Sequence, residues 1–199
     1  MSDLNSKKYE LFNKKLNFEK HLFDLFVYEN EITKNLPSFK DKRNYPFYYF
    51  LGKELHPENV LMIGNCGGYK SGFICYSSQK IKNIYIYDVS QNKSLMRITR
   101  NNLGKFMHVK KHFLTCENKD GFLKNDFFDL IVFDDISFIE NKEKLYFFYD
   151  ICKKDGFLVF DKVFDNQKYE NYLINFANKR NTSIEKFQTR NQTVIIKKI

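Results

Sequence analysis

The sequence predicts an α/β protein with a mostly parallel sheet, helices on both faces and a C-terminal antiparallel hairpin. The first observation behind this prediction is an apolar strand at 59–63 that runs into a glycine turn. The second is the alternation of strand-like and helix-like segments after it, which is typical of parallel strands joined by helical crossovers. The third is the short link at 190–192, which cannot form a parallel crossover, so the last two strands must pair in antiparallel fashion.

Each strand of the predicted sheet is a short apolar segment bounded by polar or turn residues. The expected strands are 59–63, 83–88, 107–114, 128–134, 157–161, 183–189 and 193–199. The segment 128–134 is almost entirely apolar, which favours a central parallel strand that is buried on both faces. Residues 154–156, just before the fifth strand, are predicted to form a turn.

Helices are expected between these strands, where apolar residues recur at helical spacing. The expected segments are 68–78, 90–103, 141–152 and 165–179, with a short helical turn at 120–125. Ser90 is the predicted N-cap of the second segment. The side chains of the last segment that are expected to face the sheet are those of Tyr169, Tyr172, Leu173 and Phe176.

The chain before the first strand is predicted to be helical. Apolar residues within 22–27 share one helix face, and a second helix is expected to begin near Pro46 and to end before Pro57. We therefore divide the chain into an N-terminal helical segment at 1–57, which could form a lid, and a main domain at 58–199.

The composition indicates a folded protein outside the membrane. Apolar residues make up 43% of the 199 residues, which is enough for a core. No apolar run approaches the ~20 residues that span a bilayer. The first ten residues are polar and lack the apolar centre of a signal peptide. We expect a cytoplasmic location and no membrane partner.

Charge and cysteine content point to no specific partner. The formal net charge of +9 permits nucleic acid, but the lysines are scattered along the whole chain, so nucleic acid is not favoured. The four cysteines form no C-x-x-C pair and no histidine lies at zinc-ligand spacing. Reduced, buried thiols are therefore expected.

Two motifs at the start of the sheet point to a nucleotide-type ligand. Gly64, Gly67 and Gly68 follow the strand at 59–63, and glycine lets a backbone approach a ligand where a Cβ would clash. Asp88 ends the next strand, where an acid can accept hydrogen bonds from both hydroxyls of a ribose. The two motifs predict a cofactor built on adenosine. The glycine spacing does not fit G-x-G-x-x-G, which disfavours NAD.

Four segments, in this order, resemble those of the class I, Rossmann-like S-adenosylmethionine-dependent methyltransferases. Residues 60–68 resemble the cofactor loop of that family, and Asp88 resembles its ribose-binding acid. Residues 128–135 resemble the fourth-strand motif that faces the transferred methyl group. Residues 153–161 resemble the motif around the fifth strand. The resemblance covers residues 59–199.

The resemblance implies S-adenosylmethionine as the cofactor and indicates which residues hold it. These residues are Gly64, Asn65, Gly67, Gly68, Asp88, Asn118, Asp120 and Asp134. Asn118 and Asp120 are alternatives for the position that holds the adenine amino group.

Asp134 is the candidate catalytic residue, because it follows the most apolar strand at the edge where open α/β sheets bind ligands. A carboxylate there could accept a proton from the methyl acceptor as a general base. Asp134 could instead cap the following helix or pair with Lys162. Asp134 and Asp161 together offer oxygen ligands for a divalent metal, but the ammonium of Lys162 would repel a cation. We therefore predict no metal site.

The leading interpretation is a methyltransferase that acts on a small molecule or a sugar, with Tyr45, Tyr48 or Tyr49 as candidate pocket residues. The second is an aminopropyltransferase of the spermidine synthase type. Its glycine loop likewise lacks the acid that methyltransferases carry two residues before the first glycine, a position that is Met62 here. A non-catalytic binding protein on the same fold is a third interpretation. An RNA methyltransferase is favoured only by the charge.

Overall fold

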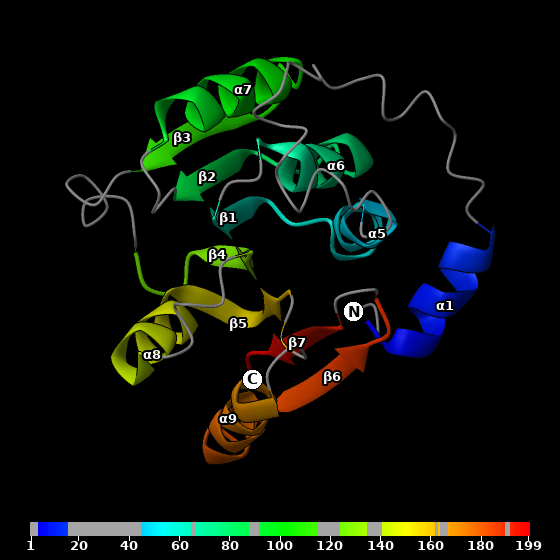
Figure 1. Ribbon diagram of the computed structural model, residues 1–199, viewed down its shortest axis with the longest axis vertical. Coiled ribbons are helices and arrows are strands. Elements are labelled where there is room, and N and C mark those ends of the chain that lie inside the picture. Colours follow the sequence, from blue (N-terminus) through cyan, green and yellow to red (C-terminus); the bar gives the residue numbers. More distant parts are fainter. Residues whose placement is uncertain are drawn as a thin grey trace.

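A seven-stranded sheet forms the centre of the protein (Figure 1). The computed structural model describes residues 4–15, 45–64, 67–87, 92–114, 124–134, 141–161, 163, 167–189 and 192–199. In sheet order the strands are β3 (Lys110–Leu114), β2 (Asn83–Tyr87), β1 (Asn59–Ile63), β4 (Phe128–Phe133), β5 (Cys152–Phe160), β7 (Thr193–Lys197) and β6 (Ser183–Phe187). Neighbours from β3 to β5 are parallel, whereas β7 is antiparallel to both β5 and β6. The predicted sheet with its closing hairpin is confirmed.

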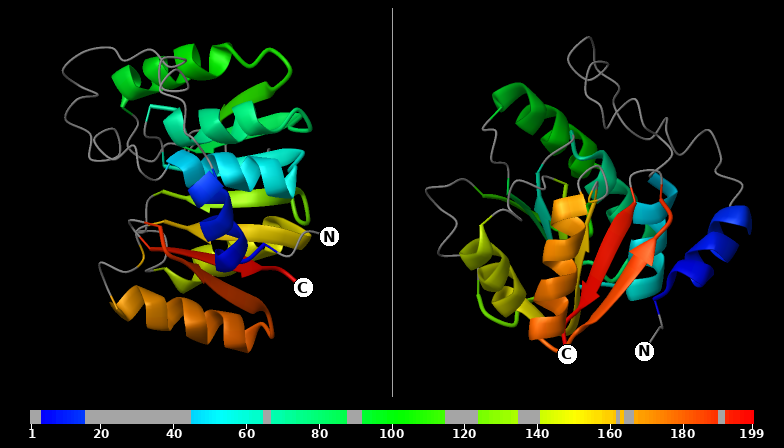
Figure 2. Two further views of the ribbon diagram at one scale, coloured as in Figure 1. Left: turned by 90° about the vertical axis from the view of Figure 1, so that its right-hand side faces the viewer. Right: turned by 60° about the horizontal axis from the view of Figure 1, so that its bottom comes forward.

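Helices cover both faces of this sheet (Figures 1 and 2). They are α1 (Ser6–Lys15), α5 (Tyr45–Leu55), α6 (Tyr69–Ser77), α7 (Lys93–Gly104), α8 (Lys142–Ile151) and α9 (Gln167–Lys179). The two layers arise because successive side chains of a strand point to opposite faces. In β1, Val60 and Met62 join a core with α5 and α6, whereas Leu61 and Ile63 join a second core with α8 and α9.

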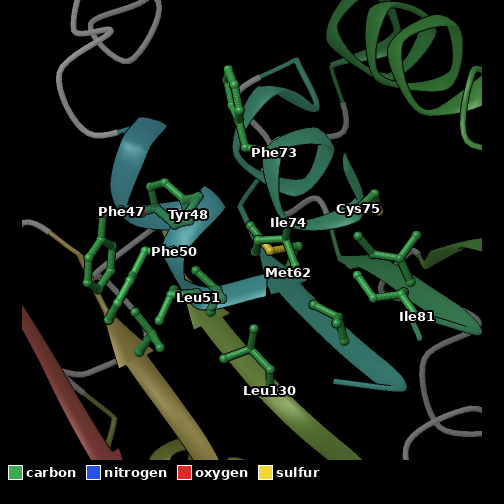
Figure 3. Close-up of a cluster of buried hydrophobic side chains, with 14 of the residues drawn as sticks. Phe47, Tyr48, Phe50, Leu51, Met62, Phe73, Ile74, Cys75, Ile81 and Leu130 are labelled. Carbon is green, nitrogen blue, oxygen red and sulfur yellow. The ribbon is translucent and has the colours of Figure 1, made fainter. Parts of the chain in front are cut away.

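Figure 3 shows part of the first core, in which apolar side chains of α5 and α6 lie over the middle strands. Leu51 of α5 and Ile74 of α6 belong to this core together with Met62 of β1 and Leu130 of β4, and Met62 is the most exposed of the four at 3%. The helix predicted near Pro46 is therefore confirmed, because α5 buries the apolar face that the sequence indicated.

α1 packs on the same core from the side of α5 and β6. Tyr9 is 4% exposed, and its ring centroid lies 5.2 Å from that of Phe47, 5.3 Å from that of Phe50 and 6.2 Å from that of Phe187. The described part of the N-terminal segment thus shares the core of the sheet. Its role as a lid remains a prediction, and the helix face predicted at 22–27 lies outside the described residues.

The start of α7 differs from the prediction. The helix begins at Lys93 and its N-cap is Asn92, whose side chain accepts hydrogen bonds from the backbone N–H groups of Ser94 and Leu95 at 3.0 and 3.1 Å. The prediction of Ser90 as the N-cap is wrong. Asparagine and serine cap helices about equally well, so the two candidates could not be ranked by residue type.

β3 and β5 also differ from the prediction at their first residues. β3 begins at Lys110 instead of residue 107, because a turn closed by a 3.1 Å bond from Val109 N–H to the Phe106 carbonyl precedes it. β5 begins earlier, at Cys152, and includes the predicted turn at 154–156 as an irregularity in its pairing with β4. The turn-forming residues are therefore present within a continuous strand.

α8 and α9, which cover the face of the sheet opposite α5 and α6, match their predicted positions. α8 follows Asn141, whose side chain caps the helix by accepting from the N–H of Lys144 at 3.2 Å. α9 buries Leu173 and Phe176, as expected from their spacing. The helical turn predicted at 120–125 lies mostly outside the described residues. Among the helices that the structure describes, none is long and apolar enough to cross a membrane.

Candidate active site

Three residues that directly follow parallel strands lie side by side at the carboxyl edge of the sheet. Gly64 follows β1, Asp134 follows β4 and Asp161 follows β5. Each donates its backbone N–H to a carbonyl of the neighbouring strand, at 3.0, 2.8 and 3.1 Å respectively. The parallel ladder therefore continues into these residues and fixes their backbones. In open α/β sheets this edge is where ligands bind.

The loop between β1 and α6 has the conformation that its glycines predict. The φ angles are 91° at Gly64, 68° at Gly67 and 77° at Gly68, all in the region that residues with a Cβ rarely adopt. A non-glycine residue would be strained at each of these three positions. The glycines are thus required by the backbone path of the loop itself.

The same loop packs closely against α7. A Cβ added at Gly68 would lie 3.2 Å from the Cα of Thr99. The side-chain amide of Asn102 donates to the carbonyl of Gly67 at 2.7 Å, and Asn102 is fully buried. These contacts show that Gly67 and Gly68 also serve the packing of the loop on α7, a reason that the sequence did not reveal.

Lys70 lies in the first turn of α6 and reaches both aspartates of this edge. Its Nζ is 2.5 Å from Asp134 Oδ1 and 2.5 Å from Asp161 Oδ2, and its side chain is 4% exposed. A positive charge is disfavoured at the N-terminus of a helix, where the dipole is also positive. The two carboxylates therefore supply the compensation that a buried ammonium needs.

Asp161 is held by hydroxyl groups as well. Tyr48 of α5 donates its hydroxyl to Asp161 Oδ2 at 2.7 Å, and Thr193 of β7 donates to Asp161 Oδ1 at 3.3 Å. Thr193 is in turn bonded to the hydroxyl of Thr189 at 2.8 Å. Asp161 is buried, and its side-chain contacts connect α5, α6 and β7 to the end of β5.

Tyr48 remains a neutral hydrogen-bond donor in this network. Burial, followed by the negative charge of Asp161, raises the pKa of Tyr48 well above its usual value of 10.0, while the charge of Lys70 acts in the opposite direction. The Lys70 ammonium also lies 5.0 Å from the centre of the Tyr48 ring, a cation–π distance.

Asp134 is the more accessible of the two carboxylates. Its side chain is 3% exposed, against 1% for Asp161. Asp134 stands directly after β4 and is oriented by Lys70. The pairing with Lys162 that the sequence suggested cannot be compared, because that side chain lies outside the described residues.

The structure brings together four of the residues predicted for the site. Gly64, Gly67, Gly68 and Asp134 all lie at the carboxyl edge around the start of α6. The remaining predicted cofactor residues lie outside the described ranges; they are Asn65, Asp88, Asn118 and Asp120.

Sequence reasoning missed Lys70 and the part played by Thr193. The available signal was a lysine two positions after a glycine pair, in a helix whose other residues up to Cys75 are all buried. Tyr48 was one of three tyrosines considered as pocket residues, and the structure shows that its hydroxyl binds Asp161.

No protein-family description and no curated protein matches this sequence. Solved structures match it as a fold. The S-adenosylhomocysteine-bound methyltransferase PaMTH1 of Podospora anserina is 14% identical with a TM-score of 0.68, over 100% of this chain and 98% of that one. The O-methyltransferase TomG of Streptomyces achromogenes, solved with S-adenosylmethionine, is 13% identical with a TM-score of 0.65, over 100% of both chains.

A spermidine synthase in complex with the transition-state analogue AdoDATO is also similar. It is 16% identical with a TM-score of 0.59, over 81% of this chain and 61% of that one. Together these likenesses show that the chain has the class I, Rossmann-like methyltransferase fold.

Proposed function

We propose that this protein is an S-adenosylmethionine-dependent methyltransferase that acts on a small molecule or a sugar. The observation that carries the proposal is the glycine turn between β1 and α6, with its three left-handed residues beside the carboxylate of Asp134. Ligands of open α/β sheets bind at this edge. The solved neighbours with S-adenosylmethionine or S-adenosylhomocysteine support the choice of cofactor.

The residues proposed to hold the cofactor follow from the position of this turn. Gly64, Gly67 and Gly68 let the loop backbone approach it, with Asn65 between them. Asp88, which follows β2, is proposed to bind the ribose hydroxyls. A final position after β3 is proposed to hold the adenine amino group and is filled by either Asn118 or Asp120.

Catalysis would consist mainly of alignment, because bound S-adenosylmethionine would supply an already activated sulfonium methyl group. Residues at this edge would orient the acceptor oxygen or nitrogen toward that methyl group. Asp134 is proposed to take the proton that the acceptor loses. Lys70 holds Asp134 in place for this role, through the 2.5 Å contact.

The likeness to spermidine synthase favours one alternative, transfer of an aminopropyl group from decarboxylated S-adenosylmethionine. Met62 supports it, because this alternative also lacks an acid before the glycine turn. The two functions differ in the cofactor that binds, so they can be separated without knowledge of the acceptor.

Calorimetric titration with S-adenosylmethionine, S-adenosylhomocysteine and decarboxylated S-adenosylmethionine tests the proposal. We expect the first two to bind with a stoichiometry of one. Asp88→Ala should weaken binding by about 1–3 kcal/mol, the range for hydrogen bonds to a charged group. The matched control is Asp150→Ala, in the last turn of α8.

Tighter binding of decarboxylated S-adenosylmethionine would support the aminopropyltransferase activity in place of the methyltransferase activity. A protein that binds S-adenosylmethionine but transfers no methyl group to any of a panel of hydroxyl and amine acceptors would be a binding protein on this fold. Absence of binding by all three ligands would contradict both proposed enzyme activities.

A further inference from the structure

The ammonium of Lys70 lies where a metal ion would have to lie if Asp134 and Asp161 were its ligands. Nζ is 2.5 Å from one oxygen of each carboxylate. Carboxylate oxygens bind Mg²⁺ and Ca²⁺ at about 2.0–2.6 Å, so an ion shared by these two oxygens would occupy the same space as the ammonium. The two carboxylates at the ends of β4 and β5 therefore already have their cation.

The surroundings keep Lys70 in this position. The side-chain exposures are 4% for Lys70, 3% for Asp134 and 1% for Asp161, so none of the three charges is screened by water. A buried charge without its counter-charge is costly, and two adjacent carboxylates cannot both stay ionised without a cation. Removal of the Lys70 charge would therefore leave two buried carboxylates without a counter-charge, whereas removal of one carboxylate would leave a neutral pair.

Asp161 does not fit a metal site as it stands. Its Oδ2 accepts from both Tyr48 and Lys70, and its Oδ1 accepts from Thr193. Magnesium and calcium need six or more oxygen ligands, including waters. In the described ranges of the chain, no group of three or more His, Cys, Asp or Glu side chains is arranged to hold a metal ion. The residues present do not fit a divalent metal while Lys70 is in place.

We infer that Lys70 is a built-in cation that takes the place of a divalent metal ion between Asp134 and Asp161. It supplies the counter-charge between the two carboxylates, holds them together and positions Asp134 at the carboxyl edge. The site thus needs no added metal to assemble. This inference stands on the contacts alone, and it holds whichever group the protein transfers or binds.

Manganese binding to variants of Lys70 tests the inference. Lys70→Ala removes the ammonium and leaves space between two carboxylates. We expect this variant to melt at a lower temperature than the wild type and to recover part of the loss in millimolar Mn²⁺. Bound Mn²⁺ can be counted from the loss of the electron paramagnetic resonance signal of the free ion. We expect the variant to bind one more Mn²⁺ ion than the wild type. The double variant Lys70→Ala/Asp134→Asn should bind Mn²⁺ at least about tenfold more weakly, because one ligand is lost.

The wild type and a matched variant supply the controls. Neither EDTA nor Mn²⁺ should change the melting temperature of the wild type. Lys153→Ala removes a lysine from a more exposed pair with Asp129, at 35% and 27% side-chain exposure. Because water already solvates that carboxylate, Mn²⁺ should leave the melting temperature of Lys153→Ala unchanged.

Three results would overturn the inference. The first is Mn²⁺ binding by the wild type that disappears in Asp134→Asn. The second is a folded Lys70→Ala protein that melts like the wild type. The third is a destabilised Lys70→Ala protein that binds no Mn²⁺, since Lys70 would then be an ordinary buried ion pair. If Lys70→Ala does not fold without metal, refolding in millimolar Mn²⁺ decides: recovery of the folded protein supports the inference, and failure to recover it overturns the inference.

Discussion

β4 carries an aspartate near each end, and each pairs with a lysine in a different environment. At the amino end, Asp129 Oδ1 lies 2.8 Å from Lys153 Nζ, and its Oδ2 accepts from the backbone N–H groups of Glu58 and Asn59. At the carboxyl end, Asp134 lies 2.5 Å from Lys70. The first pair is partly solvated and joins two chain segments, whereas the second is buried at the carboxyl edge of the sheet.

The difference between the two pairs is one of desolvation. A solvent-exposed ion pair contributes about 0–1 kcal/mol to stability, because water screens the charges in both states. A buried ion pair stabilises a protein little more than an apolar pair of the same shape does. Removal of one of its two partners, however, is strongly destabilising. A fold that only needed stability would not favour Lys70 and Asp134 in its interior. Their presence there agrees with the role that we propose for the carboxyl edge.

The largest predicted effect contrasts the two lysines. Lys70→Met should lower the free energy of unfolding by about 3–5 kcal/mol, because it leaves Asp134 and Asp161 buried without their cation. Lys153→Met should cost about 0–1 kcal/mol. Urea unfolding followed by circular dichroism measures both. Similar losses in the two variants would show that burial does not distinguish the pairs.

A second contrast concerns Gly68, which precedes α6 and packs against α7, and Gly104, the last residue of α7. Gly68→Ala should destabilise the protein by about 1–2 kcal/mol, since alanine is strained at a φ of 77°. The added Cβ would also crowd Thr99. Gly104→Ala meets open space and should stabilise α7 by about 0.4–1 kcal/mol. The same urea measurements apply. A Gly68→Ala variant with the same free energy of unfolding as the wild type would mean that the loop backbone can change its conformation.

A smaller effect separates Tyr48 from tyrosines on the surface at alkaline pH. Its raised pKa means that the folded protein keeps the phenol proton, whereas the unfolded chain releases it near pH 10. The stability from this group is therefore complete below pH 10 and is lost as the pH rises above it, by about 1.4 kcal/mol at pH 11.

Tyr48→Phe should reduce the loss of stability between pH 9 and pH 11 by the share that Tyr48 contributes, while Tyr76→Phe, at an exposed position, should leave the loss unchanged. Urea unfolding of the wild type and the two variants at pH 9 and pH 11 provides the comparison. An equal loss of stability in Tyr48→Phe and the wild type would show that the phenol ionises in the folded protein.

The sequence predicted the sheet well, because its signals are local. The strand at 59–63 has the predicted ends, since an apolar run between Pro57 and Gly64 leaves little choice. The first residues of α7 and β5 were predicted less well. Asn92 competes with Ser90 as a cap, and the turn-forming residues at 154–156 lie within a strand.

The candidate site was predicted only in part. Gly64 and Asp134 carry local signals, because each directly ends an apolar strand. Lys70 carries almost none, since its partners are 64 and 91 positions away in the sequence. Pairing over such separations depends on how α6 packs against the sheet, and periodicity does not report it.

The most direct test of the account asks at which edge of the sheet the ligand binds. Amide chemical shifts would be recorded in the ¹⁵N-labelled wild type during titration with S-adenosylhomocysteine. We expect saturable shifts at Gly64, Gly67, Gly68 and Asp134, and none at Asn59 and Asp129 at the amino edge. Saturable shifts confined to the amino edge, or none anywhere at millimolar ligand, would contradict the assignment of the carboxyl edge as a cofactor site.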